Sequence, residues 1–200
     1  MSQSIQLTSQ IKIFESMIQH LSGFTSNIRI TIYPDMCVMD AVNESQTSLT
    51  KINLTKGWFT EYNVETEITV IVTTNILYKI IRVLDDNFPI KITLSTNDLV
   101  VEGKSVQSDV TYTIPSLTID IPEIDVPDNI EYAVDISMNS KTLCSILDHL
   151  LIIGEDCSID INEDSMLFKT DGDFGSTKTY WTPGLDTSST RSSTVGSRNW

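Results

Sequence analysis

Hydrophobic positions repeat three times along the chain in one order, a helical period followed by two alternating strands. Residues 28–41 align without a gap on residues 90–103, and both segments align on residues 157–170. Before each strand pair lies an amphipathic segment with apolar residues three and four positions apart, at about residues 10–22, 74–84 and 140–151. This self-similarity indicates a supersecondary unit that has been copied, and each copy needs its neighbours to bury its apolar face.

Each predicted helix has one apolar and one polar face. The positions predicted to be buried are Ile11, Phe14, Met17, Ile18 and Leu21 in the first helix, Ile76, Leu77, Ile80, Ile81 and Leu84 in the second, and Leu143, Ile146, Leu147 and Leu150 in the third. Cys144 lies on the apolar side of the third helix and is expected in the core, whereas Tyr78 is expected to point outward. Alternating residues predict further strands at about 4–8, 47–54, 57–63, 66–72, 107–114, 131–138 and 176–181.

Three prolines interrupt the chain between the second and third units. They lie within residues 115–130, favour extended backbone and lack the N–H of a strand ladder, so this segment is predicted to be a stiff acidic linker. It separates an N-terminal domain, residues 1–114, from the first half of a second domain, residues 131–181. Residues 182–200 are rich in Ser and Thr without an apolar period, and are predicted to be a disordered tail.

Composition and charge narrow the class of protein. The net charge of −14 argues against gripping nucleic acid by bulk electrostatic attraction. No apolar run approaches the ~20 residues of a membrane-spanning helix, so no membrane partner is predicted. The three cysteines have no paired spacing, which is typical of reduced thiols in an intracellular protein.

Catalytic and metal-binding patterns are weak. Cys144 and His149 lie about 140° apart around the third helix, so they cannot pair as nucleophile and base within it. Residues 160–164 imitate the start of a calcium loop, but Ser165 stands where that loop needs a glycine. The sequence therefore predicts no enzyme, no cofactor and no metal site.

The polar helix faces carry positive charge on an otherwise acidic protein. Helix geometry turns four cationic side chains away from the predicted sheets: Lys12, Lys79, Arg82 and Lys141. Positive charge near phosphates binds nucleic acid without base contacts. These side chains are therefore the candidate contacts to duplex DNA, although outward helix faces are also where lysine and arginine ordinarily lie.

Several short segments occur in a characteristic order and spacing. They are the strand–helix opening, Met39-Asp40 followed by Ser48-Leu49, residues 72–82, residues 124–127, residues 150–154 and residues 172–175. Over residues 4–181 this pattern resembles the eukaryotic and archaeal type of DNA sliding clamp, the proliferating cell nuclear antigen family.

The resemblance implies an α+β protein with the DNA-clamp (processivity) fold, in which repeated strand–helix–hairpin units place helices on one face of curved antiparallel sheets. Three copies would close into a ring that encircles duplex DNA without sequence specificity. The ring would tether a DNA polymerase and bind a clamp loader and other proteins with clamp-binding peptides, in the nucleus of a eukaryote or at a viral replication site. The partner-binding residues that the resemblance implies are Met39, Leu49, Ile124, Val126 and Pro127.

The sequence departs from this family in ways that keep alternatives open. A clamp subunit of the family carries four units and this chain shows three, so we expect a clamp truncated at its C-terminus, frameshifted or reduced. Gln19, Ser145 and Asp148 stand where the family usually has basic residues. Strand edges at residues 107–114 and 176–181 are expected to pair between copies, but a trimer is expected to be weak or to fail, because the strand at 176–181 has incomplete backing without the fourth unit. The alternatives are a clamp-like interaction protein that has lost ring closure and a small enzyme with an acidic hairpin site.

Overall fold

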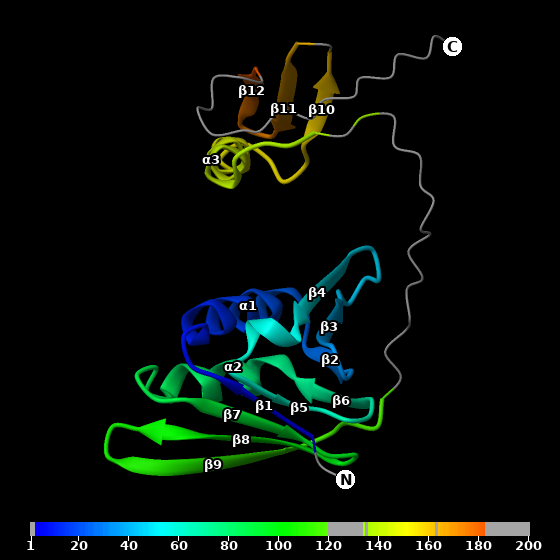
Figure 1. Cartoon of the computed structure of the whole chain (residues 1–200). Helices are drawn as coiled ribbons and strands as arrows, with labels where there is room; N and C mark the ends of the chain where they lie inside the picture. Colours follow the sequence, from blue (N-terminus) through cyan, green and yellow to red (C-terminus); the bar gives the residue numbers. More distant parts are fainter. Residues whose placement is uncertain (1–2, 120–133, 135, 163, 183–200) are drawn as a thin grey trace. The chain divides into compact units, whose positions relative to one another are not determined.

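The chain divides into two compact units, residues 1–126 and residues 127–200, called unit 1 and unit 2 below. The structure is a computed structural model, and it describes residues 3–119, 134, 136–162 and 164–182. Each unit is described here by itself (Figure 1).

Unit 1 contains two copies of the repeat. The first consists of β1 (Gln3–Leu7), α1 (Ile11–Phe24), β2 (Asn27–Ile32), β3 (Met36–Val42) and β4 (Leu49–Thr55). A short 3-10 turn (Lys56–Trp58) and β5 (Glu61–Asn63) connect it to the second copy. The second copy consists of β6 (Ile68–Thr73), α2 (Thr74–Val83), β7 (Ile90–Leu94), β8 (Asp98–Ser105) and β9 (Ser108–Pro115).

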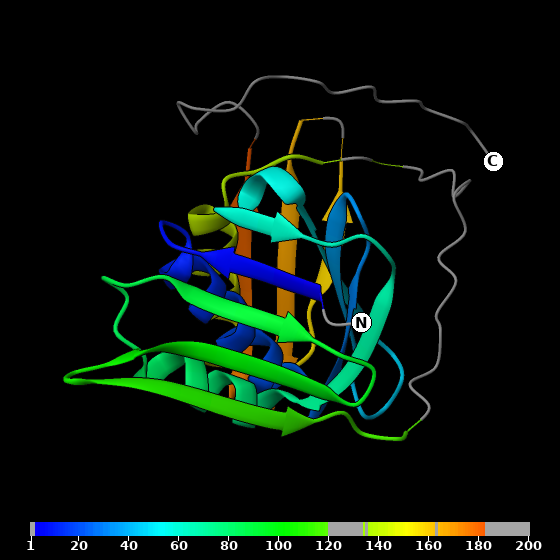
Figure 2. The ribbon, with the colours of Figure 1, turned by 60° about the horizontal axis from the view of Figure 1, so that its bottom comes forward.

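The two copies interlock through two antiparallel sheets. One sheet has the order β5-β1-β7-β8-β9 and the other has the order β4-β3-β2-β6 (Figure 2). The first strand of each repeat therefore pairs with the second strand of the other, β1 with β7 and β6 with β2. Because α1 also packs against α2, the two repeats are related by an approximate two-fold axis.

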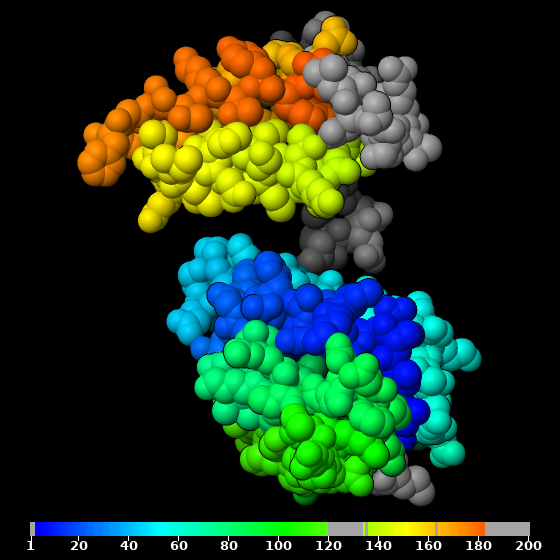
Figure 3. Space-filling view, turned by 90° about the vertical axis from the view of Figure 1, so that its left-hand side faces the viewer, coloured from blue at the N-terminus to red at the C-terminus, as the bar shows by residue number. Residues whose placement is uncertain are grey.

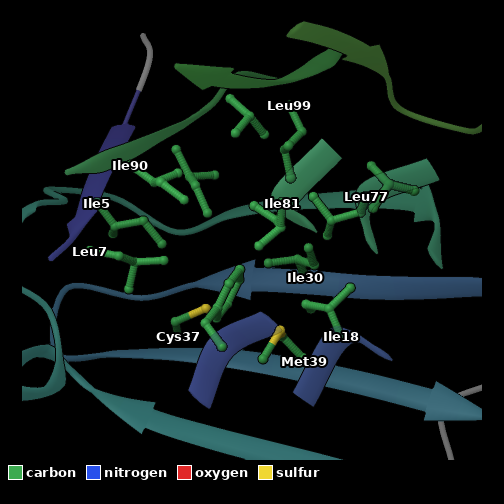
Figure 4. Packing of buried hydrophobic residues seen from close by; sticks show 14 of the residues in the cluster. Ile5, Leu7, Ile18, Ile30, Cys37, Met39, Leu77, Ile81, Ile90 and Leu99 are labelled. Carbon is green, nitrogen blue, oxygen red and sulfur yellow. The ribbon is translucent and has the colours of Figure 1, made fainter. Parts of the chain in front are cut away.

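The core of unit 1 lies where the two repeats meet (Figure 4). Ile5 and Leu7 of β1 face Ile92 and Ile90 of β7, and all four side chains are buried. Ile18 of α1 is also buried in this cluster. Each repeat thus supplies the cover for the other, which is how an amphipathic unit that cannot fold alone becomes stable.

Unit 2 contains one copy of the repeat among its described residues. Its elements are α3 (Ser140–Leu151), β10 (Ser158–Ile161), β11 (Met166–Gly172) and β12 (Gly175–Trp181). The side chain of Asn139 accepts a hydrogen bond from the Lys141 backbone N–H and so caps α3. The buried cluster beneath α3 is small and consists of Ile146, Leu150, Met166, Phe168 and Trp181.

The structure confirms the three predicted helices and corrects two predicted strands. Residues 57–63 form the 3-10 turn and the three-residue β5 instead of one strand. Of the strand predicted over 131–138, residues 134 and 136–138 lie outside any strand, and the other positions lie outside the described residues. A strand needs a neighbour for its backbone hydrogen bonds, and the described sheet of unit 2 consists of β10, β11 and β12.

Four predicted side-chain positions are also wrong. Ile76 and Leu147 are exposed. Cys144 is exposed and not a core residue. Tyr78 is half-buried and packs against the core of unit 1.

Candidate nucleic-acid and partner interfaces

The helices α1 and α2 form the candidate nucleic-acid surface of unit 1. They lie side by side, with their apolar faces in the core and their polar faces exposed (Figure 1). The two helices together carry three cationic side chains, Lys12, Lys79 and Arg82, and one carboxylate, Glu15. This surface is thus locally basic on a chain whose net charge is −14.

Lys12 is neutralised by two carboxylates. Its Nζ lies 3.2 Å from Glu15 Oε2 and 3.2 Å from Asp86 Oδ2. The hydrogen bonds to Glu15 and Asp86 raise the pKa of the exposed Lys12 ammonium above its ordinary value. Figure 3 shows the start of α1, in blue, beside the green segment that follows α2. Lys12 therefore offers less free positive charge to a phosphate than the sequence implied.

Lys79 and Arg82 are the free cations of this surface. Both are exposed on α2, three residues apart and on one face. Within the described part of the chain, neither has an ion-pair partner. Lys141 is exposed at the start of α3 in unit 2. The four predicted DNA-facing side chains are thus all exposed, while their contact with DNA stays a prediction.

The same helix surface also carries exposed apolar side chains. Ile13 of α1 and Ile76 and Val83 of α2 are each about half exposed. These apolar side chains, and the carboxylates of Glu15 and Asp86 that pair with Lys12, lower the density of positive charge on this surface. Sequence reasoning missed Asp86, because only the i,i+3 spacing of Lys12 and Glu15 is visible along the chain.

Strands β9 and β12 are candidate surfaces for contact between copies. Each is the outer strand of its sheet. Tyr180 of β12 is exposed, and the strand alternates exposed and partly buried residues before the buried Trp181. An outer strand presents unpaired backbone groups that a strand of another chain can extend.

The predicted partner-binding patch is wrong at Met39 and otherwise untested. Met39 is fully buried and points toward α1 near Ile18, as Figure 4 shows. Because side chains alternate along β3, Asp40 takes the opposite side of the sheet. Leu49 is partly exposed at the start of β4. Ile124, Val126 and Pro127 lie outside the described residues.

The beginning of the predicted linker is attached to unit 1. The Leu117 backbone N–H donates to the Ile71 carbonyl oxygen at 2.8 Å, and Ser116 Oγ accepts from the Ile71 N–H at 3.1 Å. These bonds extend β6 on its outer side. A groove of about 490 Å³ lies beside them, lined by residues 96–97 and 116–119. Its lining combines the hydroxyl and amide groups of Thr96, Asn97, Ser116 and Thr118 with the apolar side chains of Leu117 and Ile119.

Two chemical features are absent from the described residues. They contain no group of three or more His, Cys, Asp or Glu side chains placed to hold a metal ion. Among the helices described, none combines the length and the hydropathy needed to cross a membrane.

Comparison with known proteins establishes the fold. No protein-family model matches the chain, and no curated protein matches it. The structure is similar to PCNA from Thermococcus kodakaraensis, with a TM-score of 0.81 and 19% identity over 92% of this chain and 74% of that chain. It is also similar to the PCNA2–PCNA3 complex from Sulfolobus tokodaii, with a TM-score of 0.76 and 22% identity over 90% of this chain and 72% of that chain. The chain therefore has the α+β sliding-clamp fold, as the sequence predicted.

Proposed function

We propose that this chain, which has the sliding-clamp fold, is a DNA polymerase processivity factor and not an enzyme. Copies joined through β9 and β12 form a ring around duplex DNA, and the ring tethers a polymerase and other replication proteins. The observation that carries the proposal is the pair of free cations, Lys79 and Arg82, on the helix layer of a clamp fold whose net charge is −14. A surface of this kind attracts phosphates without reading the sequence.

The charge of this surface sets the strength expected for direct binding. Because Lys12 is held by Glu15 and Asp86, α2 supplies the main contacts, and affinity for DNA is weak and falls steeply with salt. Retention on DNA then comes from encirclement instead of affinity. A polymerase can move with such a ring because no base contact has to be broken.

The test is duplex binding by the variant Lys79→Glu/Arg82→Glu at low salt. Each lost phosphate contact makes the plot of log affinity against log salt shallower by roughly 1. The slope of this variant is therefore expected to be shallower by about 2, and its residual binding to duplex DNA is expected to be lost. The matched control is Lys51→Glu/Lys56→Glu, which makes the same charge change at two exposed lysines outside α1 and α2. Circular dichroism verifies that both variants are folded.

The outcomes separate the candidate functions. Loss of binding in the α2 variant alone supports the proposal. Equal loss in both variants shows that only net charge matters, and equal binding by the α2 variant and the parent shows that the helices do not face DNA. A parent that binds no duplex at any salt favours the clamp-like interaction protein that has lost ring closure.

A further inference from the structure

Unit 2 repeats the first repeat of unit 1 at a constant shift of 129 positions. The shift relates Leu7 to Ile136 before the helix, Ile18 to Leu147 within it, and Ile30 to Ile159 in the strand after it. It holds without a gap from the segment before the helix to the end of the hairpin. Each residue of unit 2 therefore has one counterpart whose surroundings are known.

The counterparts differ in burial on one face only. In unit 1 the residues Ile5, Leu7, Ile18, Ile30 and Ile32 are 0–4% exposed. Their counterparts in unit 2, Val134, Ile136, Leu147, Ile159 and Ile161, are 37–48% exposed. The next strand shows no such difference, because Met39 and its counterpart Phe168 are both buried. Unit 2 thus has an exposed apolar face formed by these five residues, called the open face below.

In unit 1 the second repeat covers this face. Ile5 and Leu7 lie opposite Ile92 and Ile90 of β7. On the other sheet, Ile30 lies opposite Val70 of β6. The helix α2 packs on α1 and completes the cover. Unit 2 has no such second repeat among its described residues, and β10 has no strand on its outer edge there.

The covering element in unit 1 is itself a copy of the element it covers. The two repeats meet about an approximate two-fold axis, in which each contributes its first strand to the other's second strand. The open face is therefore complementary to a second open face. A contact of this kind, in which one patch meets its own copy, is the ordinary form of a two-fold interface.

We propose that two copies of this chain associate through the open faces of their second units and so complete one clamp domain between them. The segment before α3 in one copy pairs antiparallel with β10 of the other, and the two α3 helices pack as α1 packs on α2. Burial of five apolar side chains from each copy drives the association.

The repeat fixes the register of the contact. In unit 1, Ile5 lies opposite Ile92 and Leu7 lies opposite Ile90. Residues 90 and 92 align with residues 157 and 159, just as residues 5 and 7 align with residues 134 and 136. Val134 therefore lies opposite the partner's Ile159, and Ile136 lies opposite the partner's Cys157. Cys157 is exposed within a single copy.

The contact uses neither β9 nor β12. The inference therefore does not depend on DNA binding, and it is tested on the free protein without nucleic acid.

The first experiment is a disulfide between copies. In a Cys144→Ser background, which removes the other exposed thiol, Ile136→Cys is expected to form a covalent dimer with the partner's Cys157 under mild oxidation. Directly opposite positions in an antiparallel pair have Cα atoms about 4.5–5.5 Å apart, which is within the Cα separation that a disulfide allows. Ser137→Cys, one residue further and on the other side of the segment, is the matched control and is expected to remain monomeric on a non-reducing gel.

The second experiment measures mass in solution by sedimentation. The parent chain is expected to reach twice the mass of one chain as its concentration rises, and Ile159→Lys is expected to remain a monomer. Phe174→Lys adds the same charge at a fully exposed hairpin position and is expected to dimerise like the parent. A parent that stays monomeric, a dimer unaffected by Ile159→Lys, or equal cross-linking at residues 136 and 137 would each overturn the inference.

Discussion

Phe168 is the side chain on which the folding of unit 2 depends most. It is 1% exposed, the most deeply buried of the five residues in the core of that unit. It lies on β11, the strand between β10 and β12, and β11 packs against α3. Replacing it with alanine removes the most deeply buried side chain of that core.

The expected cost is comparable with the whole stability of the unit. A buried Phe→Ala change costs about 3–5 kcal/mol, because the transfer free energy is lost and a cavity remains. The described part of unit 2 has about 50 residues. At about 0.05–0.15 kcal/mol per residue, its free energy of unfolding is about 2.5–7.5 kcal/mol. Phe168→Ala should therefore unfold unit 2 in a large fraction of the molecules.

Hydrogen exchange resolved by peptide measures this directly. In Phe168→Ala, the amides of β11 and β12 are expected to lose protection, while those of β2 and β3 in unit 1 retain it, because the two units have separate cores. The matched control is Tyr180→Ala on the same hairpin. That ring is 72% exposed, so its removal should change stability by no more than about 0.5 kcal/mol.

Two outcomes would contradict this reasoning. Unchanged protection of β11 and β12 in Phe168→Ala would show that the buried cluster does not hold unit 2 together. Equal loss of protection in both units would show that they unfold as one cooperative body.

Three further predictions concern one glycine and one buried thiol. Gly172→Ala should destabilise unit 2 by about 1–3 kcal/mol, because its Cβ would overlap the Ile153 carbonyl oxygen, whereas Gly57→Ala has open space and should leave the urea midpoint unchanged. Burial raises the pKa of Cys37 from 9.0 to about 12. The thiol therefore ionises at a lower pH in the unfolded chain than in the folded one, and the free energy of unfolding falls as the pH rises above about 9. Cys37→Ala should reduce this fall, as measured by urea titrations at several pH values. The same burial should leave Cys37 unreactive toward a thiol reagent at pH 8 while Cys144 and Cys157 react, and rapid labelling of all three would refute it.

Much of the secondary structure was predictable from the sequence because periodicity is a local property. The third helix was predicted at residues 140–151, which are the bounds of α3 in the structure. The strand pair at residues 90–103 was also placed correctly, within two residues at its end. The same periodicity turned Lys79 and Arg82 outward, where the structure has them.

The sequence failed where a side chain's position depends on a partner distant along the chain. Met39 was predicted at the surface and is buried, because the pairing of β3 with β2 and β4 turns its side of the strand toward α1. Lys12 was predicted as a free cation and is held by Asp86, which only the packing of α1 on α2 brings near.

The clearest division between sequence and tertiary structure lies in the repeat itself. The sequence determined that three similar units exist and which residues of each are apolar. Only the tertiary structure decided which apolar residues are buried, since Ile30 and Ile159 hold the same place in their repeats and differ in exposure by about tenfold. Burial requires a second surface, and for Ile30 that surface is a strand about forty residues further along the chain.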